Sequence, residues 1–232
     1  MTRDLRVCFV GDSFVAGVGD PEHLGWTGRL CAGSERDGLS LTGYVLGVRR
    51  QTSAEVAARW AAECRARLGG GTWESRVVVS MGVNDTGVVS MGVNDTGVDG
   101  TGVDDTGVIG TGVDDATEED GASRLSPQRS VAALGEVLGG AVSAGWPVLV
   151  VGPPAVADDA QNARTAALDE RFARVCAEHG VPHVPVLAAL AADPTWTREV
   201  AAGDGAHPGA AGYAVLAELV RPHWTAWLAA RR

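Results

Sequence analysis

The sequence of 232 residues predicts an α/β protein, a three-layer α/β/α sandwich around a central, mostly parallel sheet of five strands. Two observations support this fold class. Apolar runs of strand length recur five times along the chain, and segments with the apolar spacing of helices separate most of them. Strands that alternate with helices in this way form a parallel sheet with helices on both of its faces.

The first expected strand, residues 5–10, is a mostly apolar run that leads into Gly11-Asp12-Ser13. Gly11 permits a tight turn, so Ser13 emerges at the carboxyl end of the strand. Ligand sites of open α/β sheets lie at that edge, which makes Ser13 a candidate nucleophile. The G-x-S-x-G elbow of the α/β-hydrolases is absent, because Val15 stands where its second glycine belongs.

Capping patterns mark the start of two expected helices. Thr52 followed three residues later by Glu55 is a capping box, and Ser126-Pro127 supplies a cap and a proline at the first helical position. The expected helices span residues 25–30, 53–68, 127–142, 163–178 and 209–228. The expected strands after the first span residues 39–47, 76–81, 146–152 and 181–186, and a loop containing Trp196 follows the last of them.

Composition and length argue against several classes of function. The formal net charge of −10 disfavours nucleic acid or an anionic membrane as a main partner. No apolar run is long enough to cross a bilayer, and the first strand begins too early for a signal peptide. The four cysteines form no C-x-x-C pair and no metal-ligand spacing. We therefore expect a cytoplasmic protein with reduced thiols, no bound metal and no stable membrane insertion.

A ten-residue unit, VVSMGVNDTG, occurs four times over residues 78–117, intact in the first two copies and altered in the last two. Its period matches none of the known solenoid repeats, and its carboxylates lack the spacing of a calcium-binding EF-hand. We interpret it as a tandem duplication that forms an acidic, glycine-rich surface loop; a calcium-binding array is the alternative. The expected organisation is one domain over residues 1–232 that carries this insertion.

A second stretch that contains candidate catalytic residues is Asp204-Gly205-Ala206-His207-Pro208. An aspartate three residues before a histidine, on a loop stiffened by proline, can place its carboxylate against one imidazole nitrogen. The other nitrogen is then free to accept a proton from Ser13. A helix N-terminus capped by Asp204, with an incidental His207, explains the same pattern without catalysis.

Gly47 and Asn84 each follow an expected strand, so both fall at the same edge of the sheet as Ser13. The backbone N–H of Gly47 and the side-chain amide of Asn84 can both donate hydrogen bonds to a developing oxyanion. A glycine that ends a strand and an Asx turn are the structural alternatives for these two positions.

The order and spacing of these motifs resemble the SGNH hydrolase family, also called the GDSL esterases and lipases. The resemblance covers the chain except for the repeat and implies a flavodoxin-like SGNH hydrolase fold with no metal or organic cofactor. It implies that Ser13 is the nucleophile, with His207 as the base and Asp204 as its orienting acid. It also implies an oxyanion hole formed by the Ser13 N–H, the Gly47 N–H and the Asn84 side chain.

The repeat leaves the choice of asparagine open, because Asn84 and Asn94 occupy identical units. The equivalent residues of the last two units are Asp104 and Asp114, whose carboxylates would repel an oxyanion. We favour Asn84, because Arg76-Val77 precede its repeat unit and make the apolar run of its strand longer.

The expected function is hydrolysis of small-molecule carboxylic esters through an acyl-serine intermediate. A thioesterase or a carbohydrate O-acetyl esterase built on the same residues is an alternative. A non-catalytic protein, in which the repeat obstructs the pocket, is another. Arg50 departs from the family pattern, which often has a second glycine near Gly47, and we expect this departure to alter the rim of the pocket.

Overall fold

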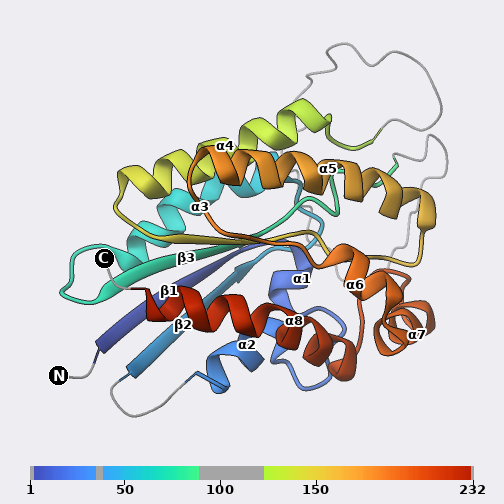
Figure 1. The fold of residues 1–232 in the computed structure, drawn as a ribbon, viewed down its shortest axis with the longest axis horizontal. Helices are drawn as coiled ribbons and strands as arrows, with labels where there is room; N and C mark the ends of the chain where they lie inside the picture. The colour runs from blue at the N-terminus through green and yellow to red at the C-terminus, as the bar shows by residue number, and fades with distance from the viewer. Residues whose placement is uncertain (1–2, 35–38, 89–122, 231–232) are drawn as a thin grey trace, which may run out of the picture.

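A sheet of five parallel strands forms the middle layer of the molecule (Figure 1). The computed structural model describes residues 3–34, 39–88 and 123–230. The strands are β1 (Arg3–Gly11), β2 (Leu39–Gly47), β3 (Glu74–Ser80), β4 (Val148–Val151) and β5 (His183–Val184), in the spatial order β2-β1-β3-β4-β5. The predicted fold class, a three-layer α/β/α sandwich, is confirmed.

Helices cover both faces of this sheet (Figure 1). On one face lie α3 (Ser53–Leu68), α4 (Pro127–Ser143) and α5 (Asp159–Glu178), and on the other lie α2 (Gly25–Ala32) and α8 (Ala210–Ala229). Side chains of β1 alternate between the two cores: Val7 and Phe9 pack with α2 and α8, whereas Cys8 and Val10 pack with α3 and α4. Burial on both faces explains why the later part of this strand, from Val7 to Val10, is apolar at every position.

The strand order reverses at β1, which has β2 on one side and β3 on the other. Gly11, the last residue of β1, pairs with Gly47 of β2 and with Ser80 of β3. The three strands therefore end level with one another. In open parallel sheets the ligand crevice lies outside the carboxyl ends at such a reversal, so this register brings the segments after the three strands together.

The structure differs from the sequence prediction mainly between residues 181 and 203. The fifth strand is only two residues long, because Pro182 and Pro185 flank it and proline cannot donate a ladder hydrogen bond. The expected loop contains two short helices instead, α6 (Leu187–Ala192) and α7 (Pro194–Ala202). Asp193 caps the second of these, with Pro194 at its first position, and Trp196 is fully buried.

The described residues on either side of the insertion lie next to each other. Val88 and Ser123 form an antiparallel bridge, and the N–H of Arg124 donates to the carbonyl of Gly87 at 2.9 Å. The segment after β3 and the segment before α4 are therefore connected by backbone hydrogen bonds. The later copies of the repeat, with Asn94, Asp104, Asp114 and the calcium-binding alternative, lie outside the described residues.

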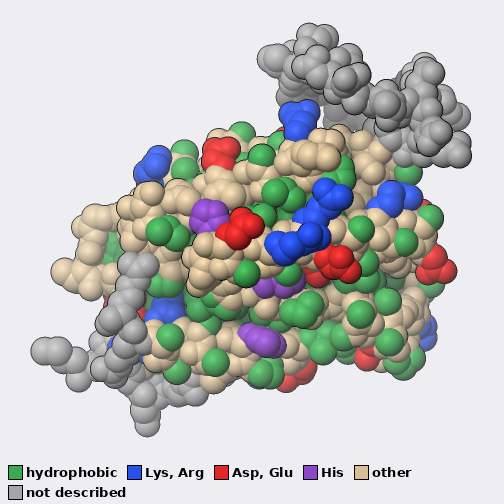
Figure 2. All heavy atoms as spheres, turned by 45° about the horizontal axis from the view of Figure 1, so that its top comes forward, with side chains coloured by type: hydrophobic (Ala, Val, Ile, Leu, Met, Phe, Trp, Pro, Cys, Tyr) green, Lys and Arg blue, Asp and Glu red, His purple; other side chains and the backbone are tan. Residues whose placement is uncertain are grey.

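Basic and acidic side chains are interspersed on the face of the molecule shown in Figure 2. No large surface of a single charge appears on that face. Within the residues that the structure describes, no helix combines the length and the apolar character that a membrane crossing requires.

Candidate active site

Ser13 is the first residue of α1 (Ser13–Ala16), a single helical turn directly after β1. Asp12 caps this turn, because its Oδ1 accepts the N–H of Phe14 at 3.0 Å. A Cβ at Gly11 would overlap the carbonyl oxygen of Ser80, so glycine alone fits between β1 and β3 there. The sequence Gly-Asp-Ser therefore places the hydroxyl of Ser13 at the carboxyl edge of the sheet, where it was predicted.

His207 connects Ser13 to Asp204. Its Nε2 lies 2.8 Å from the Oγ of Ser13, and its Nδ1 lies 2.7 Å from the Oδ2 of Asp204. The ring of Phe14 packs against the imidazole, with ring centroids 4.8 Å apart. The structure thus brings together the three side chains that the two motifs predicted, as a continuous chain from hydroxyl to imidazole to carboxylate.

Asp204 is held by its own loop. Its Oδ1 accepts the backbone N–H groups of Ala206 at 2.9 Å and of His207 at 2.8 Å. Partial burial raises the pKa of Asp204, but these hydrogen bonds and the imidazole outweigh it and bring the pKa to about 2. The prediction that Asp204 caps a helix, the alternative to its role beside His207, is wrong, because the next helix begins at Ala210 with Gly209 as its cap.

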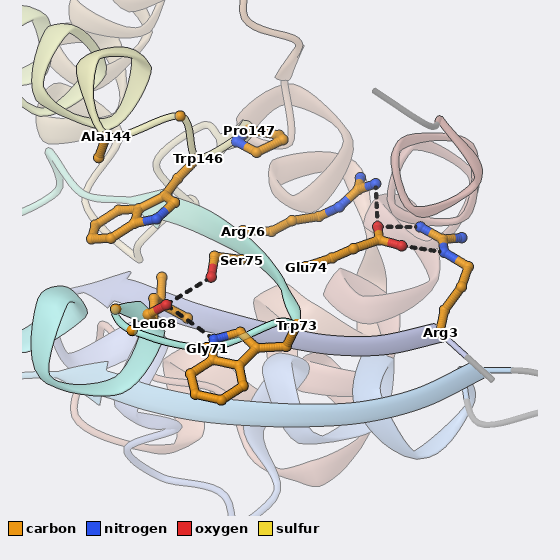
Figure 3. A pocket seen from close by; sticks show the side chains of 13 residues that line it. Arg3, Leu68, Gly71, Trp73, Glu74, Ser75, Arg76, Ala144, Trp146 and Pro147 are labelled. Carbon is orange, nitrogen blue, oxygen red and sulfur yellow. Dashed lines mark hydrogen bonds and ion pairs between the residues drawn. The ribbon is translucent and has the colours of Figure 1, made fainter. Parts of the chain in front are cut away.

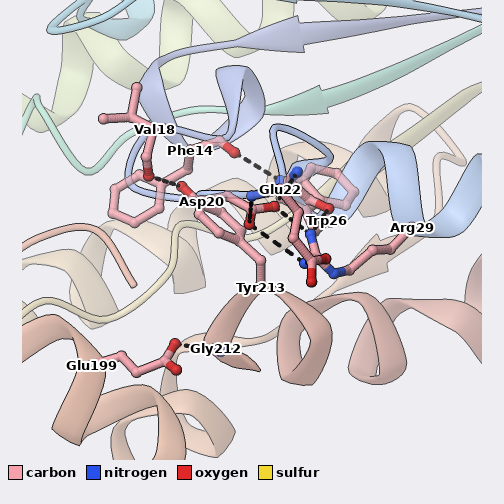
Figure 4. Close-up of polar contacts among 10 residues, drawn as sticks. Phe14, Val18, Asp20, Glu22, Trp26, Arg29, Glu199, Gly212 and Tyr213 are labelled. Carbon is pink, nitrogen blue, oxygen red and sulfur yellow. Dashed lines mark hydrogen bonds and ion pairs between the residues drawn. The ribbon is translucent and has the colours of Figure 1, made fainter. Parts of the chain in front are cut away.

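The loop that follows α1 is fixed by buried polar contacts (Figure 4). The carboxylate of Asp20 accepts the N–H of Gly25 at 2.8 Å and pairs with the guanidinium of Arg29 in α2. The hydroxyl of Tyr213 in α8 donates to the carbonyl of Val18 at 2.8 Å. These contacts tie the segment beside Ser13 to two helices and so fix the position of Ser13.

Gly47 and Asn84 lie at the same edge. A Cβ at Gly47 would lie 2.5 Å from the carbonyl oxygen of Asp12 and would overlap the nitrogen of Ala16, so β2 approaches α1 closely here. The Nδ2 of Asn84 contacts the carbonyl of Gln51 at 3.1 Å and the Oδ2 of Asp12 at 3.4 Å. Both predicted donors are therefore next to the turn that carries Ser13.

Asp12 is a residue that sequence reasoning treated only as part of a turn. It is 1% exposed, and this burial raises its pKa to about 7, while the N–H of Phe14 opposes the shift and the charge of Asp85 adds to it. Asp85, directly after Asn84, is also 1% exposed, so two buried carboxyl groups lie near Ser13. The sequence does not show that they are buried; an acidic residue directly after Asn84 was the signal that could have indicated it.

Arg50, the departure from the family pattern, has a φ of 64°. This is the left-handed region that glycine adopts most readily, so the backbone keeps the conformation of a glycine turn despite the larger residue. Arg50 is not among the residues that line the cavity at Ser13.

A cavity of about 280 Å³ opens at Ser13 and His207. Its other walls come from the segment after β3, from the start of α5 and from the histidine loop, and include Asn84, Gly87, Arg124, Asp158 and Gln161. A larger cavity, about 690 Å³, lies at the opposite end of the sheet, where Arg3 pairs with Glu74 near Trp73 (Figure 3). That cavity is lined from the amino ends of β1 and β3, so we assign the chemistry to the smaller one.

A serine, a histidine and an aspartate connected in this way at the carboxyl edge of a parallel sheet form the arrangement of a serine hydrolase. The amino-acid sequence also matches a known family. A model of the GDSL-like Lipase/Acylhydrolase family matches residues 9–215, and the chain belongs to this family. Among curated proteins, no sequence matches the chain.

Solved structures of related enzymes share the fold at low sequence identity. The lipase/acylhydrolase from Enterococcus faecalis is 17% identical, with a TM-score of 0.59 over 96% of this chain and 95% of that one. Axe2, an acetylxylan esterase from Geobacillus stearothermophilus, is 14% identical, with a TM-score of 0.62 over 97% of both chains. AlinE4, an SGNH-hydrolase family esterase, is 18% identical, with a TM-score of 0.59 over 99% and 100%.

Proposed function

We propose that this chain hydrolyses carboxylic esters with Ser13 as its nucleophile. The observation that carries the proposal is the pair of short contacts made by His207, 2.8 Å to the Oγ of Ser13 and 2.7 Å to the Oδ2 of Asp204. Membership of the GDSL-like lipase and acylhydrolase family supports ester hydrolysis, as do the esterases among the structural neighbours.

The chemistry proceeds in two halves. The Oγ of Ser13 attacks the ester carbonyl while its proton passes to the Nε2 of His207, and Asp204 stabilises the resulting imidazolium. Collapse of the tetrahedral intermediate breaks the bond to the alcohol, which leaves with the proton from His207. Water then attacks the acyl-serine with His207 as the base, releasing the acid and restoring the hydroxyl of Ser13.

The negative oxygen of each tetrahedral intermediate needs donors that face it. The N–H groups of Ser13 and Gly47 and the side chain of Asn84 are the donors in this proposal. Asn84 directs its Nδ2 to Gln51 and Asp12 before substrate binds, and the contact with Asp12 is the longer of the two. An oxyanion would replace that weaker contact.

The same steps serve a thioester or an acetylated sugar, because each passes through an acyl-serine. The proposal therefore includes these substrate classes as alternatives. It also includes a small-molecule ester as the partner and a cytoplasmic location. A protein disabled by its insertion is disfavoured by the short contact between Ser13 and His207, which the ends of the insertion at Gly87 and Arg124 do not interrupt.

A fluorophosphonate probe tests the nucleophile directly. The wild-type protein should form a single adduct, mapped to Ser13 by mass spectrometry, and should hydrolyse 4-nitrophenyl acetate. Ser13→Ala should lose both reactions while keeping its circular dichroism spectrum. An adduct elsewhere, or hydrolysis by the variant at the wild-type rate, would overturn the proposal. Parallel assays with an acyl thioester and an acetylated xylo-oligosaccharide rank the substrate classes.

A further inference from the structure

Arg124 lines the catalytic cavity and is exposed. Its side chain extends past Gly87, where a Cβ would lie 3.8 Å from the Cδ of Arg124 and 3.9 Å from the Nε2 of Gln161. Within the part of the chain that the structure describes, its guanidinium forms no hydrogen bond or ion pair. A cation with unused donors therefore stands in the wall of the cavity that contains Ser13.

The other charged groups of this cavity already have partners. Asp158 caps α5, because its Oδ1 accepts the N–H of Gln161 at 2.8 Å, and Asp204 accepts two backbone N–H groups and the imidazole. The positive charge of Arg124 acts on the carboxylates of Glu55 and Asp85, but among the described residues none accepts a hydrogen bond from its guanidinium.

A neighbouring cation favours an anion beside Arg124. The N-terminus of α5 at the same cavity adds no free positive end, because the carboxylate of Asp158 already caps it. Arg164, also in α5, donates its Nε to the carbonyl of Thr86 at 2.9 Å, which places a second cation close to the segment that Arg124 crosses.

We infer that Arg124 binds a carboxylate of the substrate, so that the enzyme prefers esters that carry a negative charge. The inference rests on the proposed function and adds a substrate class to it. A planar guanidinium presents paired N–H groups that match the two oxygens of a carboxylate. The carboxylate belongs either to the acyl part or to the alcohol part of the ester, and the two cases are separated by experiment.

Two substrate pairs test the preference. For the acyl part, 4-nitrophenyl hemiglutarate is compared with its methyl ester; for the alcohol part, acetoxyacetate is compared with methyl acetoxyacetate. In at least one pair, Arg124→Gln should lower the ratio of kcat/KM for the charged substrate to that for the neutral one by about fivefold, as expected for a solvent-accessible ion pair. The effect should shrink at high salt.

Arg171→Gln is the matched control, because Arg171 is exposed on α5 and does not line the cavity. It should leave both ratios at their wild-type values. If Arg124→Gln also leaves both ratios unchanged, the inference is overturned. The proposed function is judged separately, by loss of neutral-ester hydrolysis in Ser13→Ala.

A binding measurement decides the inference even where no turnover is seen. Titration calorimetry of the Ser13→Ala variant should show tighter binding of the charged member of the preferred pair, by about fivefold. Adding Arg124→Gln to that variant should abolish the difference. Equal affinity for the charged and neutral members before Arg124 is changed would contradict the inference.

Discussion

The Oδ2 of Asp12 lies 3.4 Å from the Nδ2 of Asn84, beside the serine that Asp12 precedes in the chain. The carbonyl of Gln51 lies 3.1 Å from the same nitrogen. A side-chain amide has two N–H groups, so both have protein acceptors before any substrate is present. The amide is therefore held in place beside Ser13 by Gln51 and Asp12, and in the proposed mechanism an oxyanion replaces the weaker of these two contacts.

The first prediction concerns the two intact copies of the repeat. Asn84→Ala should lower kcat for a 4-nitrophenyl ester by about 10²–10³-fold, as the loss of an oxyanion donor does. Asn94→Ala is the matched control, from the same position of the second copy, and should leave kcat close to the wild-type value. Steady-state kinetics of both variants decides the point. A larger effect from Asn94 would assign the donor to the second copy instead.

The second prediction follows from the buried carboxyl group of Asp12. Burial raises its pKa to about 7, whereas an unfolded aspartate titrates near pH 4. Between these two values the folded protein holds a proton that the unfolded chain has released. The stability that this group contributes is therefore fully present below about pH 4 and is lost as the pH rises through about 7.

Asp12→Asn should remove this pH dependence, because asparagine is neutral throughout. Urea unfolding at about pH 4.5 and 8.5 measures it. Between the two, the free energy of unfolding of the wild type should fall relative to that of the variant by about 2–4 kcal/mol. The test compares only the change in the free energy of unfolding between the two pH values. A variant that is less stable by the same amount at both pH values therefore gives the same result. Parallel pH profiles would contradict a proton held on Asp12.

The third prediction concerns the close approach of β2 to α1. Gly47→Ala should lower the free energy of unfolding by about 2–4 kcal/mol, because the new Cβ meets backbone atoms of Asp12 and Ala16 that cannot move independently of Ser13. Ester hydrolysis should fall with it. Gly135→Ala in α4 is the control: its Cβ meets nothing within 4 Å and should raise stability by about 0.5–1 kcal/mol. Chemical denaturation that finds Gly47→Ala as stable as the wild type would refute the packing argument.

The sequence predicted the fold where one physical signal dominated. The apolar run of β1 from Val7 to Val10 reflects burial on both faces, and the glycines at the ends of β1 and β2 reflect contacts that leave no room for a side chain. It failed where weaker signals competed. The pair Asp193-Pro194 is a helix start of the same kind as Ser126-Pro127, yet the surrounding residues were read as a loop.

In the site, too, features with a clear local signal were predicted and features without one were missed. Ser13, Asp204 and His207 were predicted because each belongs to a motif with a local geometry, and the sheet then brings the motifs together. The burial of Asp12 and the position of Arg124 depend on segments far away in the sequence. Arg124 reaches the cavity only because the two ends of the insertion pair with each other, and no local pattern reports such a pairing.

The last prediction concerns the insertion itself. Replacement of residues 89–122 by a four-residue Gly-Ser linker should leave the fold intact, because Val88 and Ser123 are already bridged. The N–H of Arg124 also donates to the carbonyl of Gly87 at 2.9 Å, and that of Leu125 to the carbonyl of Asp85 at 3.1 Å. Halving the number of residues between Val88 and Ser123 about three times lowers the entropy cost of bringing these two residues together by about 2 kcal/mol. The melting temperature should therefore stay equal or rise.

The shortened protein should also keep its reaction with a fluorophosphonate, because Asn84, Gly87 and Arg124 all remain in the cavity wall. A matched control places the same linker across residues 87–124, which removes the bridge and both lining residues, and should melt at a lower temperature. Differential scanning fluorimetry and labelling of Ser13 measure the two properties independently. A shortened protein that is stable but unreactive would show that the insertion takes part in the site. One that fails to fold would show that the contacts at its base do not suffice to hold β3 and α4 together.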